Sequence, residues 1–161
     1  MPGSPRGRRV TLDDLAALTR PLVGLPVTRA WRGHGSCIVL EIGPLTGTHP
    51  RTGNPCADAS IMVEWSWRVE SRRAVRFGSW STDRKISGGL ASLTGRTVLD
   101  VGVEGRLPEL SVALDGGVWL RSFMIVEGQP AWTVFLPDGS WLCVERGVLV
   151  HDTQNVPSPG E

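Results

Sequence analysis

The chain carries one short motif twice at a constant offset. Leu-x-Gly-x-x-Val occupies residues 22–27 and again residues 93–98. Strand-like apolar runs follow each copy, at 38–42 and 61–67 in the first half and at 110–114 and 119–125 in the second. Self-similarity at a long period indicates a repeated supersecondary unit that buries its apolar face against its copy. We therefore expect a pseudo-duplicated domain built from two related halves, 11–80 and 83–150.

Each half begins with a predicted helix. Thr11 followed three residues later by Asp14 is typical of a capped helix N-terminus, and this helix should end at Pro21. Apolar spacing predicts a second helix over residues 83–93, although its two internal glycines cost about 1 kcal/mol each relative to alanine. Gly95, and the equivalent glycine of the first motif, are placed to end a helix with positive φ.

The segment from Ile61 to Val69 alternates between apolar and polar residues with period two. Such alternation predicts one continuous, half-buried antiparallel strand. Its inward face includes Trp65 and Trp67, so we expect both indoles to lie in the core.

Turn residues divide the second half into hairpins. Asp115-Gly116-Gly117 should join the strand ending at Leu114 to a strand over 118–126, and a turn at 137–140 should join the last two strands. Strands therefore dominate, with two short helices. We predict an α+β protein, with an antiparallel sheet or partial barrel; an all-β sandwich or barrel is the alternative. Residues 1–10 read as a disordered arm, 11–150 as a single domain and 151–161 as a flexible tail.

Charge and hydropathy exclude several classes. The formal net charge is +1, and without the three arginines of residues 1–10, 14 basic residues remain against 16 acidic ones. Nucleic-acid binding by the folded body is therefore disfavoured, because it requires a concentrated basic face. No apolar run approaches the ~20 residues of a membrane span. Three cysteines without a paired pattern fit reduced thiols, so we expect a cytoplasmic protein that does not enter a membrane.

Two polar segments are candidate interaction sites. The halves differ most at residues 43–58, where the first half has a long insertion rich in Gly, Pro and Thr. Such a loop is either a recognition element or a flexible excursion. The second segment is a hairpin over 68–76, whose arginines either form a solvated strand face or bind an anionic partner. The interaction residues predicted in the loop (46–58) and the hairpin are His49, Arg51, Asn54, Asp58, Arg68, Arg72, Arg73 and Arg76.

Chemically reactive residues form no recognisable catalytic pattern. His34 and Ser36 lie two residues apart in a glycine turn, but the spacing is not that of a nucleophile elbow. A structural turn is one reading, and a ligand or hydrolytic pocket near His34 and Ser36 is the alternative. The histidines and cysteines lack the spacing of a zinc site, and a phosphate-binding glycine loop is absent, so we expect no metal and no cofactor.

Trp80 and Trp119 fit no inward alternation. Exposed aromatic residues near arginine are typical of protein-binding hot spots. The alternative is that these indoles close the ends of a barrel.

Three stretches carry a resemblance. They are residues 31–36, residues 64–70, and Ser122-Phe-Met followed by Trp132 and Pro137-Asp-Gly139. Together they resemble uncharacterised small bacterial proteins, some of which are similar to immunity-type proteins that accompany secreted toxins. The resemblance spans roughly residues 11–150 and implies a fold more than an activity. We therefore expect a non-enzymatic, protein-binding module, such as an immunity-type or regulatory partner that masks another protein.

Overall fold

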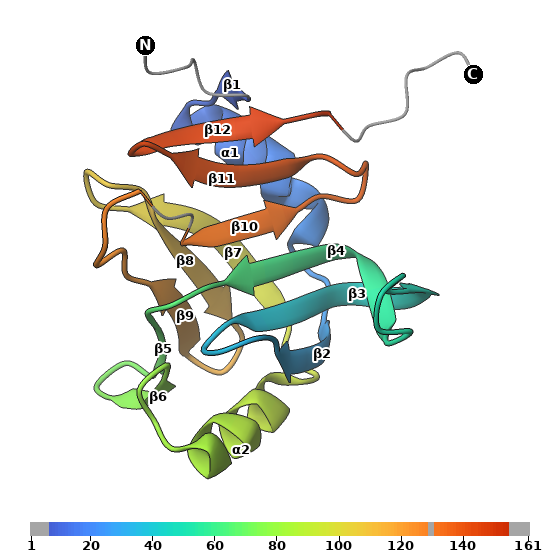
Figure 1. Ribbon diagram of the computed structural model, residues 1–161, viewed down its shortest axis with the longest axis vertical. Coiled ribbons are helices and arrows are strands. Elements are labelled where there is room, and N and C mark those ends of the chain that lie inside the picture. Colours follow the sequence, from blue (N-terminus) through green and yellow to red (C-terminus); the bar gives the residue numbers. More distant parts are fainter. Residues whose placement is uncertain (1–6, 129–130, 155–161) are drawn as a thin grey trace.

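Two antiparallel sheets pack around a shared core in the computed structural model, which describes residues 7–128 and 131–154. The seven-stranded sheet has the order β1-β12-β11-β10-β4-β3-β2 and the five-stranded sheet the order β6-β5-β9-β8-β7. The first sheet comprises β1 (Arg8–Arg9), β2 (Val27–Arg32), β3 (Ile38–Thr48), β4 (Pro55–Val63), β10 (Trp132–Phe135), β11 (Trp141–Glu145) and β12 (Val148–Asp152). The second comprises β5 (Trp67–Glu70), β6 (Val75–Gly78), β7 (Val98–Glu104), β8 (Glu109–Leu114) and β9 (Val118–Ser122). Strands of the two sheets cross steeply (Figure 1).

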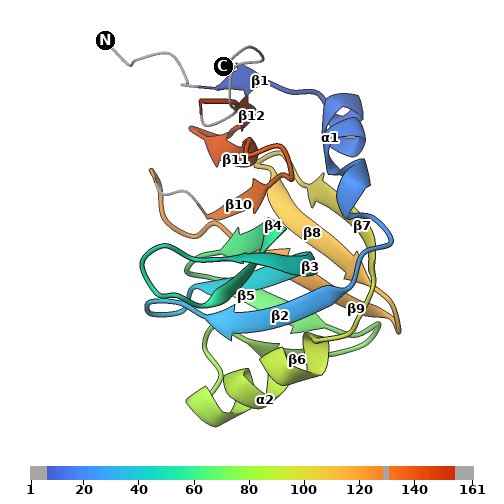
Figure 2. The same ribbon diagram turned by 90° about the vertical axis from the view of Figure 1, so that its right-hand side faces the viewer.

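Two short α-helices complete the described fold. They are α1 (Leu12–Thr19), which continues into the 3-10 helix η1 (Arg20–Leu22), and α2 (Asp83–Leu93). The helices lie towards opposite ends of the long axis (Figures 1 and 2). The predicted β-rich architecture, with antiparallel sheets and two short helices, is therefore confirmed. No helix of the described residues is long and apolar enough to cross a membrane.

Both helices begin where the sequence predicts. At α1, the Thr11 hydroxyl accepts a hydrogen bond from the Asp14 N–H, and the Asp14 carboxylate accepts one from the Thr11 N–H. This reciprocal capping box satisfies two N–H groups that the helix leaves unpaired. The second helix covers the predicted residues 83–93 and buries Ile86, Leu90 and Leu93 against the core.

The two copies of the repeated motif bind each other. The Gly24 N–H donates to the Val98 carbonyl over 2.8 Å, and the Gly95 N–H donates to the Val27 carbonyl over 2.7 Å. Val27 and Val98 also donate their own N–H groups across the contact, over 2.7 and 2.9 Å. Both glycines have a φ near +88°, which glycine adopts without steric cost. The contact places α1 against β7 and α2 against β2, so each helix packs on a strand from the other half of the chain.

The predicted continuous strand over residues 61–69 is broken. β4 ends at Val63 in the seven-stranded sheet, and β5 begins at Trp67 in the five-stranded sheet, so residues 64–66 cross between the sheets. Trp67 is buried as predicted, at 3 % exposure. The prediction for Trp65 is wrong: its φ is +62° and its side chain is 53 % exposed. The change of sheet requires a backbone turn that period-two alternation does not reveal.

A second crossover returns the chain to the seven-stranded sheet. β9 ends at Ser122, and the next strand, β10, pairs with β4. The predicted extension of this strand to Val126 is therefore wrong. Residues 123–128 and 131 are the described part of the crossover, and Ile125 and Val126 are exposed within it.

A buried tryptophan follows each crossover and is fixed in the same way. The Trp67 indole N–H donates to the Ser36 carbonyl in the β2–β3 turn over 2.6 Å. The Trp132 indole N–H donates to the Pro108 carbonyl in the β7–β8 turn over 2.9 Å. Each indole thereby satisfies the one polar group that a buried tryptophan must pair.

The predicted long loop at 43–58 is largely a β-hairpin. β3 continues to Thr48 and β4 begins at Pro55, which leaves a short turn closed by the His49 N–H donating to the Asn54 carbonyl over 2.8 Å. The register shifts between Ile42 and Leu45, where Gly43 and Pro44 interrupt the regular pairing. The β3–β4 arm, residues 43–58, extends from the side of the molecule (Figure 1).

The terminal segments enter the fold further than predicted. Arg8 and Arg9, assigned to the disordered arm, form β1 and pair with β12. His151 and Asp152, assigned to the flexible tail, are the last residues of β12 and are buried. The rest of the predicted arm and tail, residues 1–6 and 155–161, lies outside the described residues.

Candidate binding surface

The glycine turn between β2 and β3 serves a structural role. The Ser36 hydroxyl donates to the Trp65 carbonyl over 2.8 Å, so its proton is already engaged. His34 is exposed, and its backbone carbonyl accepts from the Cys37 N–H over 3.2 Å. Burial, aided by the charge of Glu64, raises the pKa of Cys37 to about 11, so this thiol is protonated at neutral pH. The turn therefore positions Trp65, whereas the pocket predicted near His34 and Ser36 stays a prediction.

Residues 64–66 hold Trp65 in the left-handed region of backbone space. The Ser36 hydroxyl fixes the Trp65 carbonyl, and the Phe123 N–H donates to the Ser66 carbonyl over 2.8 Å. Trp67 anchors the following residue in the core. These contacts determine a conformation that large residues adopt only at a cost. The Trp65 indole itself stays largely in solvent.

Trp80 lies on an adjacent segment. The Ser79 N–H donates to the Trp67 carbonyl over 3.0 Å, so the loop after β6 runs beside the start of β5. Trp80 follows directly and is 88 % exposed, more than any other large hydrophobic side chain described. An ion pair of 2.6 Å between Arg32 and Asp83 joins the start of α2 to the end of β2. Because their backbone segments are adjacent, we group Trp65, Trp80 and the turn 33–37 under one name, the tryptophan surface.

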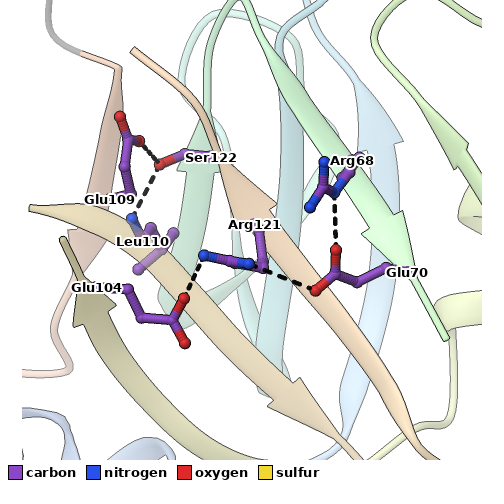
Figure 3. Close-up of polar contacts among 7 residues, drawn as sticks. All are labelled: Arg68, Glu70, Glu104, Glu109, Leu110, Arg121 and Ser122. Carbon is purple, nitrogen blue, oxygen red and sulfur yellow. Dashed lines mark hydrogen bonds and ion pairs between the residues drawn. The ribbon is translucent and has the colours of Figure 1, made fainter. Parts of the chain in front are cut away.

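The predicted arginine hairpin is partly neutralised. Arg68 pairs with Glu70 over 2.7 Å, and Arg121 on β9 reaches both Glu70 and Glu104 (Figure 3). The Arg68 guanidinium also lies over the Phe123 ring, 4.5 Å from its centroid. Arg68 is thus part of an ion-pair network on the outer face of the five-stranded sheet. Arg72, Arg73 and Arg76 are exposed around the β5–β6 turn.

The two predicted interaction segments do not form one surface. The tip of the β3–β4 arm and the β5–β6 hairpin lie on opposite sides of the molecule (Figure 1). On the arm, Arg51 is exposed and Asn54 half-buried, and the half-buried His49 accepts a weak bond from the Arg51 N–H at its Nδ1 atom, over 3.3 Å. Asp58 accepts from the Thr46 hydroxyl over 2.8 Å and so ties the two strands of the arm together.

The structure brings together a Ser–His–Asp cluster that the sequence did not reveal. The Ser140 hydroxyl donates to the Asp138 carboxylate and lies 2.8 Å from Nε2 of His151. Hydrogen bonds from the Ser140 side chain and backbone lower the pKa of Asp138, and His151 adds a smaller effect. Ser140 is fully buried, and its proton points to the carboxylate rather than to the imidazole. The cluster therefore fixes the β10–β11 turn against β12 and lacks the proton path of a catalytic triad. No sequence signal joins these residues, because His151 follows the turn at a distance.

Metal-binding chemistry has no support in the described ranges. No group of three or more His, Cys, Asp or Glu side chains in residues 7–128 and 131–154 could hold a metal ion. The cysteines Cys37, Cys56 and Cys143 are free thiols.

Comparison with known proteins finds no matching family model, no matching curated protein and no matching solved structure. The resemblance to immunity-type proteins stays a prediction.

Proposed function

We propose that the protein is a binding module that contacts a partner protein through the tryptophan surface. One observation carries the proposal: Trp65 is held with φ at +62° and still leaves 53 % of its side chain in solvent. A left-handed conformation costs a residue with a Cβ about 1–2 kcal/mol. Strained residues concentrate at functional sites, where the surrounding contacts impose them.

The neighbouring Trp80 strengthens this interpretation. Tryptophan is enriched among the few residues that dominate protein–protein binding energies. Hydrogen bonds already fix both segments that carry these indoles: the Ser36 hydroxyl donates to the Trp65 carbonyl, and the Ser79 N–H donates to the Trp67 carbonyl. Little conformational entropy would then be lost on binding, which favours affinity. A partner with apolar pockets for two indoles fits this surface.

The biological role that we propose is that of an immunity-type or regulatory protein that masks its partner in the cytoplasm. Free thiols at Cys37, Cys56 and Cys143 support a reducing compartment. In this proposal the tryptophan surface is the main contact with the partner protein. The β3–β4 arm and the exposed arginines of the β5–β6 hairpin, which the sequence predicted as interaction segments, are secondary contacts.

We further infer that the fold arose by duplication. Support comes from the reciprocal bonds between the two Leu-x-Gly-x-x-Val motifs and from the matched indole bonds of Trp67 and Trp132. Topology adds to this, because β5 crosses to pair with β9 just as β10 crosses to pair with β4. The first crossover, residues 64–66, is then equivalent to the second, whose described residues are 123–128 and 131.

The test is affinity capture from the source cells with purified full-length chain, followed by measurement of Kd for the captured protein. The variant Trp65→Ala/Trp80→Ala should weaken binding by about 1,000-fold, since each hot-spot residue contributes about 2 kcal/mol. The matched control is Leu12→Ala/Leu99→Ala, which removes two exposed apolar residues from other elements. Unchanged affinity in the tryptophan variant, or an equal loss in the control, contradicts the proposal.

A further inference from the structure

An open apolar cleft of about 900 Å³ lies beside the second crossover, on the face of β10 and β11 that points away from the core. Thr133 and Cys143 are cross-strand partners on this face, whereas Val134 and Leu142 are a pair that faces the core. The residues that shape the cleft are Leu107, Ile125, Val126, Thr133, Trp141 and Cys143. Its volume is within the range that small-molecule sites occupy in proteins.

The segment after β9 forms one wall of the cleft, and one carboxylate fixes the beginning of this segment. Glu109 accepts hydrogen bonds of 2.6 Å from the Ser122 hydroxyl and from the Met124 N–H. Figure 3 shows the contact of Glu109 with Ser122 at the end of β9. Beyond it, Ile125 is 63 % exposed. Covering a large, water-exposed apolar side chain with a ligand is favourable, because it removes apolar surface from water.

Charge limits what the cleft can hold. Burial is the main cause that raises the pKa of Cys143 to about 11, so the floor carries a neutral thiol. Trp141 adds an aromatic face. The charged lining residues are Glu127, Glu145 and Arg146, two carboxylates and one guanidinium. A ligand of either charge would lose hydration against the apolar floor, and an anion would also meet a net negative lining.

We propose that this cleft binds a small, uncharged molecule with an apolar, ring-containing body that stacks on Trp141. The site is distinct from the tryptophan surface, because its lining includes neither Trp65, Trp80 nor the turn 33–37. The two sites lie on neighbouring crossovers, which are joined by the hydrogen bond from the Phe123 N–H to the Ser66 carbonyl. The cleft therefore adds a ligand function to the proposed protein-binding role.

The test uses the full chain and the uncharged dye Nile red, whose fluorescence rises in apolar sites. Wild type should bind one dye per chain. Ile125→Glu should weaken dye binding by at least tenfold. Val126→Glu provides a second variant at an exposed position of the same wall. Leu99→Glu, at an exposed residue of β7, is the matched control and should bind as wild type does. A circular dichroism melt confirms that each variant is folded.

Two competitors of equal size test the charge requirement. Naphthalene-2-methanol should displace the dye, and 2-naphthoate should displace it at least tenfold less well. Three outcomes overturn the proposal: no dye binding to wild type, unchanged binding in both glutamate variants, or equal displacement by the carboxylate. Loss of dye binding in Trp65→Ala/Trp80→Ala would also overturn it, because the dye would then report the tryptophan surface.

Discussion

The backbone strain at Trp65 predicts an inverted order of stability for two small substitutions. Alanine at this position keeps the cost of positive φ, about 1–2 kcal/mol, whereas glycine avoids it. Glycine in turn loses about 0.4–1 kcal/mol through its greater freedom in the unfolded chain. Both variants lose the same indole contacts, so these cancel. Trp65→Gly should therefore be more stable than Trp65→Ala by about 1 kcal/mol.

Urea denaturation followed by circular dichroism measures this difference, provided that the m-values of the two variants agree. The same pair of substitutions at Trp80, which is exposed and has no positive φ, is the control. There the ordinary order should hold, with Trp80→Ala at least as stable as Trp80→Gly. If Trp65→Ala equals or exceeds Trp65→Gly in stability, the inference of backbone strain at residue 65 is refuted.

Two further predictions concern the stability of the folded protein. Gly88→Ala should stabilise α2 by about 1 kcal/mol, because the added methyl meets no atom within 4 Å. Gly89→Ala should instead destabilise the protein, because its Cβ would lie 2.5 Å from the Phe77 ring. Equal effects of the two substitutions in chemical denaturation would contradict this prediction. The thiols of Cys37 and Cys143 lose their protons near pH 11 in the folded protein but near pH 9 when unfolded. The unfolded chain binds fewer protons between these values, so the free energy of unfolding should fall as the pH rises from about 9 to 11. Replacing both cysteines with alanine should flatten this pH dependence of the free energy of unfolding. An unchanged slope would refute the raised pKa values of these two thiols.

Local chemistry made much of the fold predictable. The capping residues Thr11 and Asp14 specify a helix start through hydrogen bonds within one turn, and the structure confirms them. Gly24 and Gly95 have the predicted positive φ because few other residues tolerate it. Such features depend on neighbours in sequence, so the sequence reveals them directly.

The candidate sites depended on contacts that sequence spacing does not encode. Trp65 continues the alternation of its strand, yet the chain changes sheets there, and only the β5–β9 pairing explains why. Ser140 and His151 meet because β11 and β12 pair, which brings distant residues together. The repeated motif predicted related halves, but the sequence could not show that the two copies bind each other.

The most direct test of the tryptophan surface is ¹⁹F NMR of the chain labelled with 5-fluorotryptophan. Single substitutions assign the signals of exposed Trp65 and Trp80 and of buried Trp67 and Trp132. On addition of the captured partner, the signals of Trp65 and Trp80 should shift, and those of Trp67 and Trp132 should stay in place. Binding that leaves the Trp65 and Trp80 signals unmoved would contradict the account.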